Sequence, residues 1–224
     1  MSSVKIQIKQ LVKYFFFPDQ KEGKDVIEKI GHREYVGGLW KEIGLLQFQF
    51  LVSAGLKPND CLFDIGCGSL RAEVHFIRYL NKGKYIGIDK EPSIIECGLN
   101  EELRHKEIIS KAPNFIVSKS FCFKGIKQKP SFSIAQSLFS HLNPNDIRLC
   151  LKNLREFVKK DHIFFATYKQ GYSIFNKKTS NSFTVFYYSF DQLAELASNE
   201  GWKAYHIDEW GHPRKQKMIK FISI

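Results

Sequence analysis

The sequence lacks the features by which several protein classes are recognised. No two of its five cysteines have the CxxC spacing of a zinc or dithiol site, so we expect reduced thiols and no bound metal. No apolar run approaches the roughly 20 residues that span a bilayer. The N-terminus has no secretory signal peptide, and the chain has no internal repeat. These absences predict a cytoplasmic protein without a transmembrane segment.

The composition is that of an ordinary globular domain, with 43% hydrophobic and 25% charged residues among 224. The 34 Lys and Arg residues exceed the 23 Asp and Glu residues, so the formal net charge is +11. This excess leaves nucleic acid, a phosphorylated substrate or a membrane surface open as anionic partners. No block of five or more Lys and Arg residues occurs, and this dispersal argues against a dedicated nucleic-acid surface.

Two apolar helical patterns precede the main body of the chain. Residues 1–18 carry an apolar stripe at helical spacing with lysines to one side, and Pro18 ends the pattern. This helix is expected to pack on the protein's own core or on a partner subunit, with contact to a membrane surface as the weaker alternative. A second helix is expected within 37–56. We therefore divide the chain into an N-terminal helical segment, 1–58, and a compact domain, 59–224.

Strand-like and helical segments then alternate. Strands are predicted at 61–65, 85–89, 115–119, 132–136 and 162–168. Helices are predicted at 70–80, 93–105, 144–159 and 190–200. This alternation predicts an α/β fold with a doubly wound, mostly parallel sheet. Two further strands, 202–209 and 217–224, have only a short loop between them, so the last strand should run antiparallel.

A glycine turn after the first strand is the strongest functional signal. Gly66 and Gly68 allow a tight turn and close approach of a ligand to the main chain. Asp89 ends the next strand, 21 residues after Gly68, where a carboxylate can accept both hydroxyls of a ribose. Arg71 stands where a dinucleotide site needs a third small residue, and Asp64 suits an ammonium group better than a pyrophosphate. The pattern therefore indicates an adenosine cofactor with a cationic amino-acid end.

Two segments of this region resemble a known family. DIGCG at 64–68 and GID at 87–89 resemble the first two motifs of class I S-adenosylmethionine-dependent methyltransferases. The resemblance covers about residues 30–224 and implies a Rossmann-like, seven-stranded sheet with an antiparallel last strand. Three further segments look like a subgroup of small methyltransferases often found beside natural-product or cell-surface glycan genes: HREYVGGLW at 32–40, AQSLFSHL at 135–142 and WGHPRKQ at 210–216.

The resemblance implies S-adenosylmethionine as the cofactor and assigns its contacts. Asp64, Gly66 and Gly68 should line the methionine end, and Asp89 should bind the ribose. Lys90 should neighbour the ribose or the adenine. Ser120 or Phe121 should contact the adenine, although Phe121 as a core residue stays open. The remaining expected contacts, at the methyl pocket, the glycine turn and the end of the fourth strand, are Tyr35, Arg71, Gln136 and Ser137.

The residues at the end of the fourth strand limit the chemical class of the methyl acceptor. It has no Asn/Asp-Pro-Pro-aromatic turn, no cysteine nucleophile and no acidic metal-binding cluster, which disfavours base or amide N-methylation, C5 methylation and catechol methylation. We predict methyl transfer to an oxygen of a small molecule or saccharide, with N-methylation of a small amine as the alternative. An RNA or protein methyltransferase, or a catalytically inactive cofactor-binding module, also stays open.

A base must take the proton of a hydroxyl acceptor, and three histidines are candidates: His141 first, then His212 and His32. For each, a structural hydrogen-bonding role is the alternative. The aromatic-rich stretch 168–188 is expected to contact the acceptor. The basic group His212, Arg214, Lys215 and Lys217 is expected to lie on a solvated surface. The alternative is that its loop bends inward and brings it near the carboxyl edge of the sheet.

Overall fold

The computed structural model describes residues 22–172, 179–207 and 209–224. The helix expected at 1–18 lies outside the described residues. Seven strands form one sheet: β1 (Leu62–Ile65), β2 (Tyr85–Asp89), β3 (Asn114–Val117), β4 (Phe132–Ala135), β5 (Ile163–Tyr168), β6 (Trp202–Ile207) and β7 (Lys217–Ser223). Their order is β3-β2-β1-β4-β5-β7-β6, and β7 runs antiparallel to both β5 and β6. The predicted doubly wound sheet with an antiparallel last strand is confirmed.

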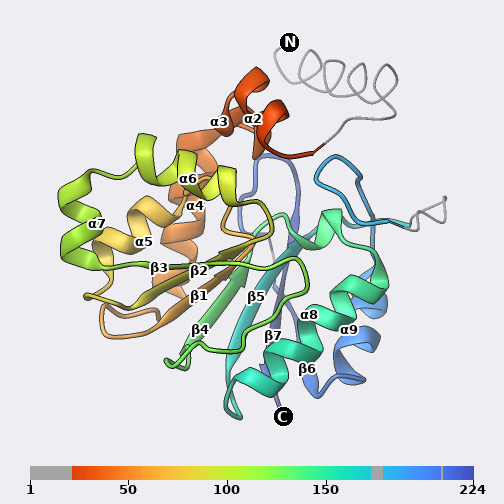
Figure 1. Ribbon diagram of the computed structural model, residues 1–224. Helices are drawn as coiled ribbons and strands as arrows, with labels where there is room; N and C mark the ends of the chain where they lie inside the picture. Colours follow the sequence, from red (N-terminus) through yellow and green to blue (C-terminus); the bar gives the residue numbers. More distant parts are fainter. Residues whose placement is uncertain (1–21, 173–178, 208) are drawn as a thin grey trace.

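Helices cover both faces of the sheet (Figure 1). They are α2 (Lys24–Ile30), α3 (His32–Tyr35), α4 (Trp40–Ser53), α5 (Glu73–Tyr79), α6 (Pro92–Glu101), α7 (His105–Lys111), α8 (Pro144–Phe157) and α9 (Phe190–Ser198), with a short 3₁₀ turn at Phe139–His141. The core has one part between the sheet and α8 and α9, and another between the sheet and α4 and α5. In β1, Phe63 faces the first part and Leu62 the second, which explains why this strand is apolar on both faces.

The two best-defined helix starts are those with capping signals in the sequence. The Asn143 side chain accepts from the Asp146 backbone N–H, and Pro144 occupies the first turn of α8. Ser189 and Gln192 form a reciprocal capping box at the start of α9. Both predicted helices are confirmed, because their start signals are contained within four consecutive residues.

Three helix boundaries differ from the prediction. The helix expected from residue 70 begins at Glu73, because Leu70 adopts a positive φ of 68° as the chain leaves the glycine turn. The helix expected over 93–105 is two helices, α6 and α7. The helix expected within 37–56 begins only at Trp40, after Leu39 in the left-handed region. No helix in the described part of the chain combines the length and apolarity needed to cross a bilayer.

Candidate cofactor and acceptor site

The glycine turn joins the carboxyl ends of β1 and β2. Backbone N–H groups of Gly66 and Cys67 donate to the Ile88 carbonyl at 2.7 and 3.1 Å. Both Gly66 and Gly68 have positive φ, at 79° and 57°. A Cβ on Gly68 would lie 3.0 Å from the Val36 side chain. The turn therefore needs glycine for its backbone conformation and for the close approach of the N-terminal segment.

Two helices hold the end of this turn from opposite sides. In α4, a Cβ on Gly44 would lie 2.5 Å from the Arg71 carbonyl oxygen. In α6, a Cβ on Gly98 would lie 2.6 Å from Leu70 Cγ and 2.8 Å from the Ser69 carbonyl oxygen. At both glycines a backbone carbonyl lies closer than 3.0 Å to the added Cβ, and a backbone carbonyl cannot move aside as the end of a flexible side chain can. Sequence reasoning did not single out either glycine.

Replacement of Gly98 by alanine is therefore expected to destabilise the protein. Overpacking costs about 1–3 kcal/mol, which should exceed the roughly 1 kcal/mol that alanine gains over glycine in a helix. Urea denaturation measures the free energy of unfolding. Asn100→Ala, at an exposed position of the same helix, is the control and should leave stability unchanged or slightly raised. A Gly98→Ala protein more stable than the wild type would contradict the close packing of α6 on the turn.

Asp89 points from the end of β2 into the glycine turn. Its Oδ2 accepts from the Gly68 backbone N–H at 2.9 Å, and its Oδ1 accepts from the Glu91 N–H at 3.0 Å. Burial raises the pKa of Asp89, and these backbone hydrogen bonds oppose that rise. The Asp89 carbonyl also accepts from Ser118 N–H at the end of β3. One carboxylate thus lies where the ends of β1, β2 and β3 meet.

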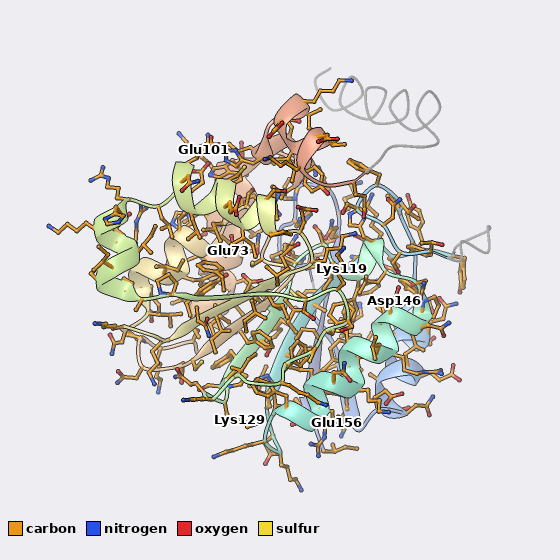
Figure 2. The ribbon with its side chains drawn as sticks, in the orientation of Figure 1. Glu73, Glu101, Lys119, Lys129, Asp146 and Glu156 are labelled. Atoms are coloured by element: carbon orange, nitrogen blue, oxygen red, sulfur yellow. The ribbon has the colours of Figure 1, made fainter. Side chains whose placement is uncertain are left out.

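Asp64 lies behind the turn, and its carboxyl is 2% exposed. The Tyr85 hydroxyl donates to Asp64 Oδ2 at 3.3 Å. Burial, and then the charge of the neighbouring Glu73, raise the pKa of Asp64 well above its ordinary value. Figure 2 shows Glu73 among the packed side chains, whereas Glu101 stands on the outside of α6. Burial raises the pKa of Glu73 as well, so the interior disfavours a negative charge on both carboxyls at once.

Arg71 ties the N-terminal segment to the turn. Its Nη1 donates to the carbonyls of Val36 and Gly38, each at 3.1 Å. Its Nε is buried and has no partner among the described residues. Burial lowers the pKa of Arg71 to about 10. Arg71 stands where a dinucleotide site has its third small residue. Here its guanidinium holds the N-terminal segment against the glycine turn.

The N-terminal segment meets the stretch after β5 over the same edge of the sheet. Lys90 Nζ lies 2.5 Å from Glu22 Oε2, and Glu22 also accepts from the Ser182 backbone N–H. The Tyr35 hydroxyl donates to Ser182 Oγ at 3.5 Å, and its ring packs edge-on against Phe183 with centroids 5.7 Å apart. Sequence reasoning named Tyr35 and Lys90 but missed Glu22 and Ser182. No local pattern signals a contact across 160 residues.

Ser120 and Phe121 follow β3 and are held by α8. Their backbone carbonyls accept from Asn153 Nδ2 at 3.1 and 3.0 Å. Ser120 is exposed, while the Phe121 ring is half-buried against the core between the sheet and α8. The structure thus supports packing of Phe121 on the core.

A polar cluster lies where β4 and β5 end. Ser137 accepts from Gln216 Nε2 at 2.9 Å, and its own backbone N–H donates to Thr167 Oγ1 at 2.6 Å. The Thr167 hydroxyl donates to Gln216 Oε1 at 2.7 Å. Gln136 Nε2 lies 3.1 Å from His212 Nε2. Gln136 and Ser137 were predicted here. The sequence pattern did not indicate Thr167, and it included Gln216 only as the last residue of the segment 210–216.

The expectation of a solvated basic surface is wrong for His212 and Arg214. His212 is 7% exposed and Arg214 is half-buried, because the loop before β7 bends inward over the sheet edge. The Arg214 side chain donates to the Gly37 carbonyl, and Trp210 Nε1 donates to the Gln216 carbonyl at 2.8 Å. Lys215 is exposed as expected. The inward bend brings a histidine and an arginine to the polar cluster.

Comparison with solved structures identifies the architecture. Magnesium protoporphyrin IX methyltransferase from Synechocystis PCC 6803, solved with bound S-adenosylmethionine, superposes with a TM-score of 0.61 at 10% identity over 92% of this chain and 99% of its own. The CcbJ methyltransferase from Streptomyces caelestis superposes with a TM-score of 0.61 at 11% identity, over 80% of this chain and 89% of its own. The fold is that of class I S-adenosylmethionine-dependent methyltransferases.

A third methyltransferase of this fold is the glycopeptide N-methyltransferase MtfA, solved with S-adenosylmethionine. It superposes with a TM-score of 0.62 at 9% identity, over 81% of this chain and 94% of its own. No protein-family model matches the sequence. At these identities the likeness establishes the methyltransferase fold, while the site must be interpreted from its own residues.

The three candidate histidines differ in which ring nitrogens are occupied. His32 Nε2 lies 2.7 Å from Glu102 Oε1, and its Nδ1 lies 3.4 Å from Glu101 Oε2. In His212, Nδ1 lies 3.1 Å from the Arg214 backbone N and Nε2 lies 3.1 Å from Gln136 Nε2, so both ring nitrogens have a partner. Burial, and then neighbouring cations, lower the pKa of His212 to about 4.

His141 has a different arrangement. Its Nδ1 lies 2.7 Å from the Thr184 carbonyl, which can only accept, so Nδ1 carries the proton. Burial lowers the pKa of His141 to about 4, although the bond to Thr184 opposes this shift. The neutral ring therefore has its lone pair on Nε2, for which no described residue is a hydrogen-bond partner. This nitrogen is available to accept a proton.

Proposed function

We propose that the protein is an S-adenosylmethionine-dependent methyltransferase that acts on an oxygen of a small molecule or saccharide. The observation that carries this proposal is the Asp89 carboxylate, hydrogen-bonded to Gly68 N–H at the end of β2 in a methyltransferase fold. The similar structures solved with S-adenosylmethionine or S-adenosylhomocysteine support the choice of cofactor.

The residues present fit this cofactor. Gly66 and Gly68 both have positive φ, a backbone conformation that glycine adopts without strain and that turns the main chain at the end of β1. Asp89 is a half-buried carboxylate that can accept from ribose hydroxyls, and Gln136 Oε1 is buried without a partner among the described residues. We propose that Gly66, Gly68 and Asp89 hold the cofactor, that Gln136 faces its amino-acid end, and that Tyr35 and Lys90 cover it. Asp64 and Arg71 then support the turn from behind.

The residues of the chain supply position and proton transfer. When bound, S-adenosylmethionine supplies a methyl group on a positively charged sulfur, whose C–S bond breaks as the new bond to the acceptor oxygen forms. His141 Nε2 takes the proton of the acceptor hydroxyl, because this nitrogen carries the lone pair in the neutral ring. Tyr35, Phe183 and the N-terminal segment exclude water from the edge of the sheet.

A base with a free lone pair favours oxygen over the alternative, a small amine. A neutral amine is already nucleophilic and needs no strong base, whereas a hydroxyl must lose its proton during transfer. In His32 and His212 both ring nitrogens are occupied, so we assign these residues to holding α6 and the loop before β7. We also propose that residues 1–58 cover the cofactor of the domain 59–224, since Ile27 packs with Cys67 and Ile94.

Calorimetry with S-adenosylhomocysteine tests the proposal directly. We expect a dissociation constant in the micromolar range, about −8 kcal/mol, and a rise in melting temperature with ligand concentration. NAD serves as the control, because it shares the adenosine but carries a pyrophosphate. Heat of binding from NAD with none from S-adenosylhomocysteine would contradict the proposed cofactor. Binding without turnover on any hydroxyl or amine acceptor would instead favour a catalytically inactive binding module.

A further inference from the structure

Three cationic side chains converge on the polar cluster at the ends of β4 and β5. Arg71 and Arg214 donate to the neighbouring carbonyls of Gly38 and Gly37, so both guanidinium groups lie at one turn of the N-terminal segment. Lys169 directly follows the last residue of β5, and its charge lowers the pKa of both His141 and His212, after burial as the main cause. The Tyr188 N–H donates to the Lys169 carbonyl at 2.9 Å, and the same segment supplies the Thr184 carbonyl that binds His141, so Lys169 lies beside the segment that holds the proposed base.

These cations lack the carboxylate partners that some other arginines of the described residues have. Arg33 and Arg78 each form a close pair with a carboxylate, at 2.7 Å to Glu102 and 2.7 Å to Glu107. Among the described residues, by contrast, no carboxylate oxygen lies within 4.0 Å of the cationic nitrogens of the three converging side chains. These side chains are Arg71, Lys169 and Arg214.

Their burial makes this lack of partners costly. Arg71 is 8% exposed, and Lys169 and Arg214 are half-buried. Burial, and then the charge of Arg214, lower the pKa of Lys169. Cations withdrawn from water are normally paired with an anion. The charges of Glu73 and Asp64 act to raise the pKa of Arg71, and that of Glu34 acts to raise the pKa of Arg214, but none of these carboxylates forms an ion pair with either cation. The pKa of Lys169 is raised by no carboxylate of the described residues, so an anion that arrives with a ligand would complete the cluster.

We propose that the methyl acceptor carries an anionic group, a carboxylate or a phosphate, which Lys169 and Arg214 bind beside His141. This inference rests on the proposed function, because it gives the acceptor of that reaction its chemical class. The Lys169 ammonium lies 5.8 Å from the centroid of the Tyr187 ring and has no carboxylate of the described residues within 4.0 Å. The Arg214 guanidinium retains donors beyond the one bound to Gly37. The acceptor hydroxyl then faces His141 Nε2, while the anion fixes the orientation of the molecule.

The same chemistry could be supplied by the methionine carboxylate of the cofactor, so the test must separate the two sources. The protein is first saturated with S-adenosylhomocysteine, which brings its own carboxylate. Inorganic phosphate then replaces chloride at constant ionic strength, and the melting temperature is followed as phosphate increases. Wild type, Lys169→Met and Lys169→Arg are compared. Lys203→Met, at an exposed lysine of β6, is the matched control.

We expect phosphate to raise the melting temperature of the wild type saturably. In Lys169→Met the apparent phosphate dissociation constant should rise about tenfold, as for the loss of one hydrogen bond between charged groups. Lys169→Arg and Lys203→Met should bind phosphate like the wild type, and all four proteins should bind S-adenosylhomocysteine equally.

Two results would overturn the inference. One is a phosphate response that is absent in the wild type or unchanged in Lys169→Met. The other is a loss of S-adenosylhomocysteine affinity in Lys169→Met, which would assign the cluster to the cofactor carboxylate. If the wild type binds no S-adenosylhomocysteine, the proposed function fails. A phosphate response of the protein alone that depends on Lys169 would still establish the anion site.

Discussion

In His141→Gln, methyl transfer to a hydroxyl acceptor is expected to slow by about 10²–10⁴, the usual contribution of a general base. Glutamine approximates the size of the ring but has no nitrogen lone pair to take the proton. The affinity for S-adenosylhomocysteine should stay within about a few-fold of the wild type. Because the pKa of His141 is about 4, wild-type kcat should hold from neutral pH downward and fall as pH approaches 4. Hydroxide should partly rescue the variant at high pH.

His162 provides a matched control for this experiment. It is a second buried histidine, and burial lowers its pKa to about 4. His162 directly precedes β5, at the opposite edge of the sheet, and its Nε2 lies 2.9 Å from Ser133 Oγ. His162→Gln should therefore perturb stability without changing kcat or its pH profile. An equal loss of kcat in both variants, or an unchanged kcat in His141→Gln, would remove His141 from the reaction.

Burial of both histidines also predicts how stability depends on pH. Their folded pKa values lie below the ordinary value of 6.5, so the unfolded chain binds more protons between about pH 6.5 and 4. Stability is fully present above pH 6.5 and declines as pH falls through this window. Urea denaturation of His162→Gln should show a shallower decline than the wild type. An equally steep decline would mean that His162 does not remain neutral in the folded protein.

Replacement of Asp89 by alanine is expected to weaken S-adenosylhomocysteine binding by about 1.5–3 kcal/mol, the range for hydrogen bonds to a charged group. The variant loses the acceptor for the ribose and the bond that orders Gly68 N–H. Calorimetry should show the same loss of affinity for 5′-methylthioadenosine, which keeps the ribose and lacks the amino acid.

Glu96→Gln is the control for Asp89→Ala. Glu96 is an exposed carboxylate on α6, close in sequence but without a contact to the glycine turn. Its replacement should leave both dissociation constants unchanged, which separates a specific contact from a change in local charge. If Asp89→Ala weakens S-adenosylhomocysteine but not 5′-methylthioadenosine, Asp89 serves the amino-acid end, and its assignment to the ribose is wrong.

Several elements could be predicted because their causes are local. The strand 85–89 agrees with β2, and the signals at Asn143 and Ser189 locate the starts of α8 and α9. The antiparallel last strand follows from the short loop that precedes it, because no crossover helix fits there. In contrast, α3 spans four residues and α7 seven. Helices this short are stable only through tertiary packing, so their sequences carry little signal.

The sequence by itself determined the methyltransferase fold and the position of the glycine turn with Asp89, because each depends on contiguous residues and on the order of the strands. Only the tertiary structure decided which histidine has a free lone pair. That property depends on the Thr184 carbonyl for His141 and on the Arg214 N–H for His212. The inward bend of the loop before β7 likewise depends on Gly37, 177 residues away in the chain. Hydrogen bonds over such separations form only when the folded sheet brings its carboxyl edge together, and no local pattern encodes them.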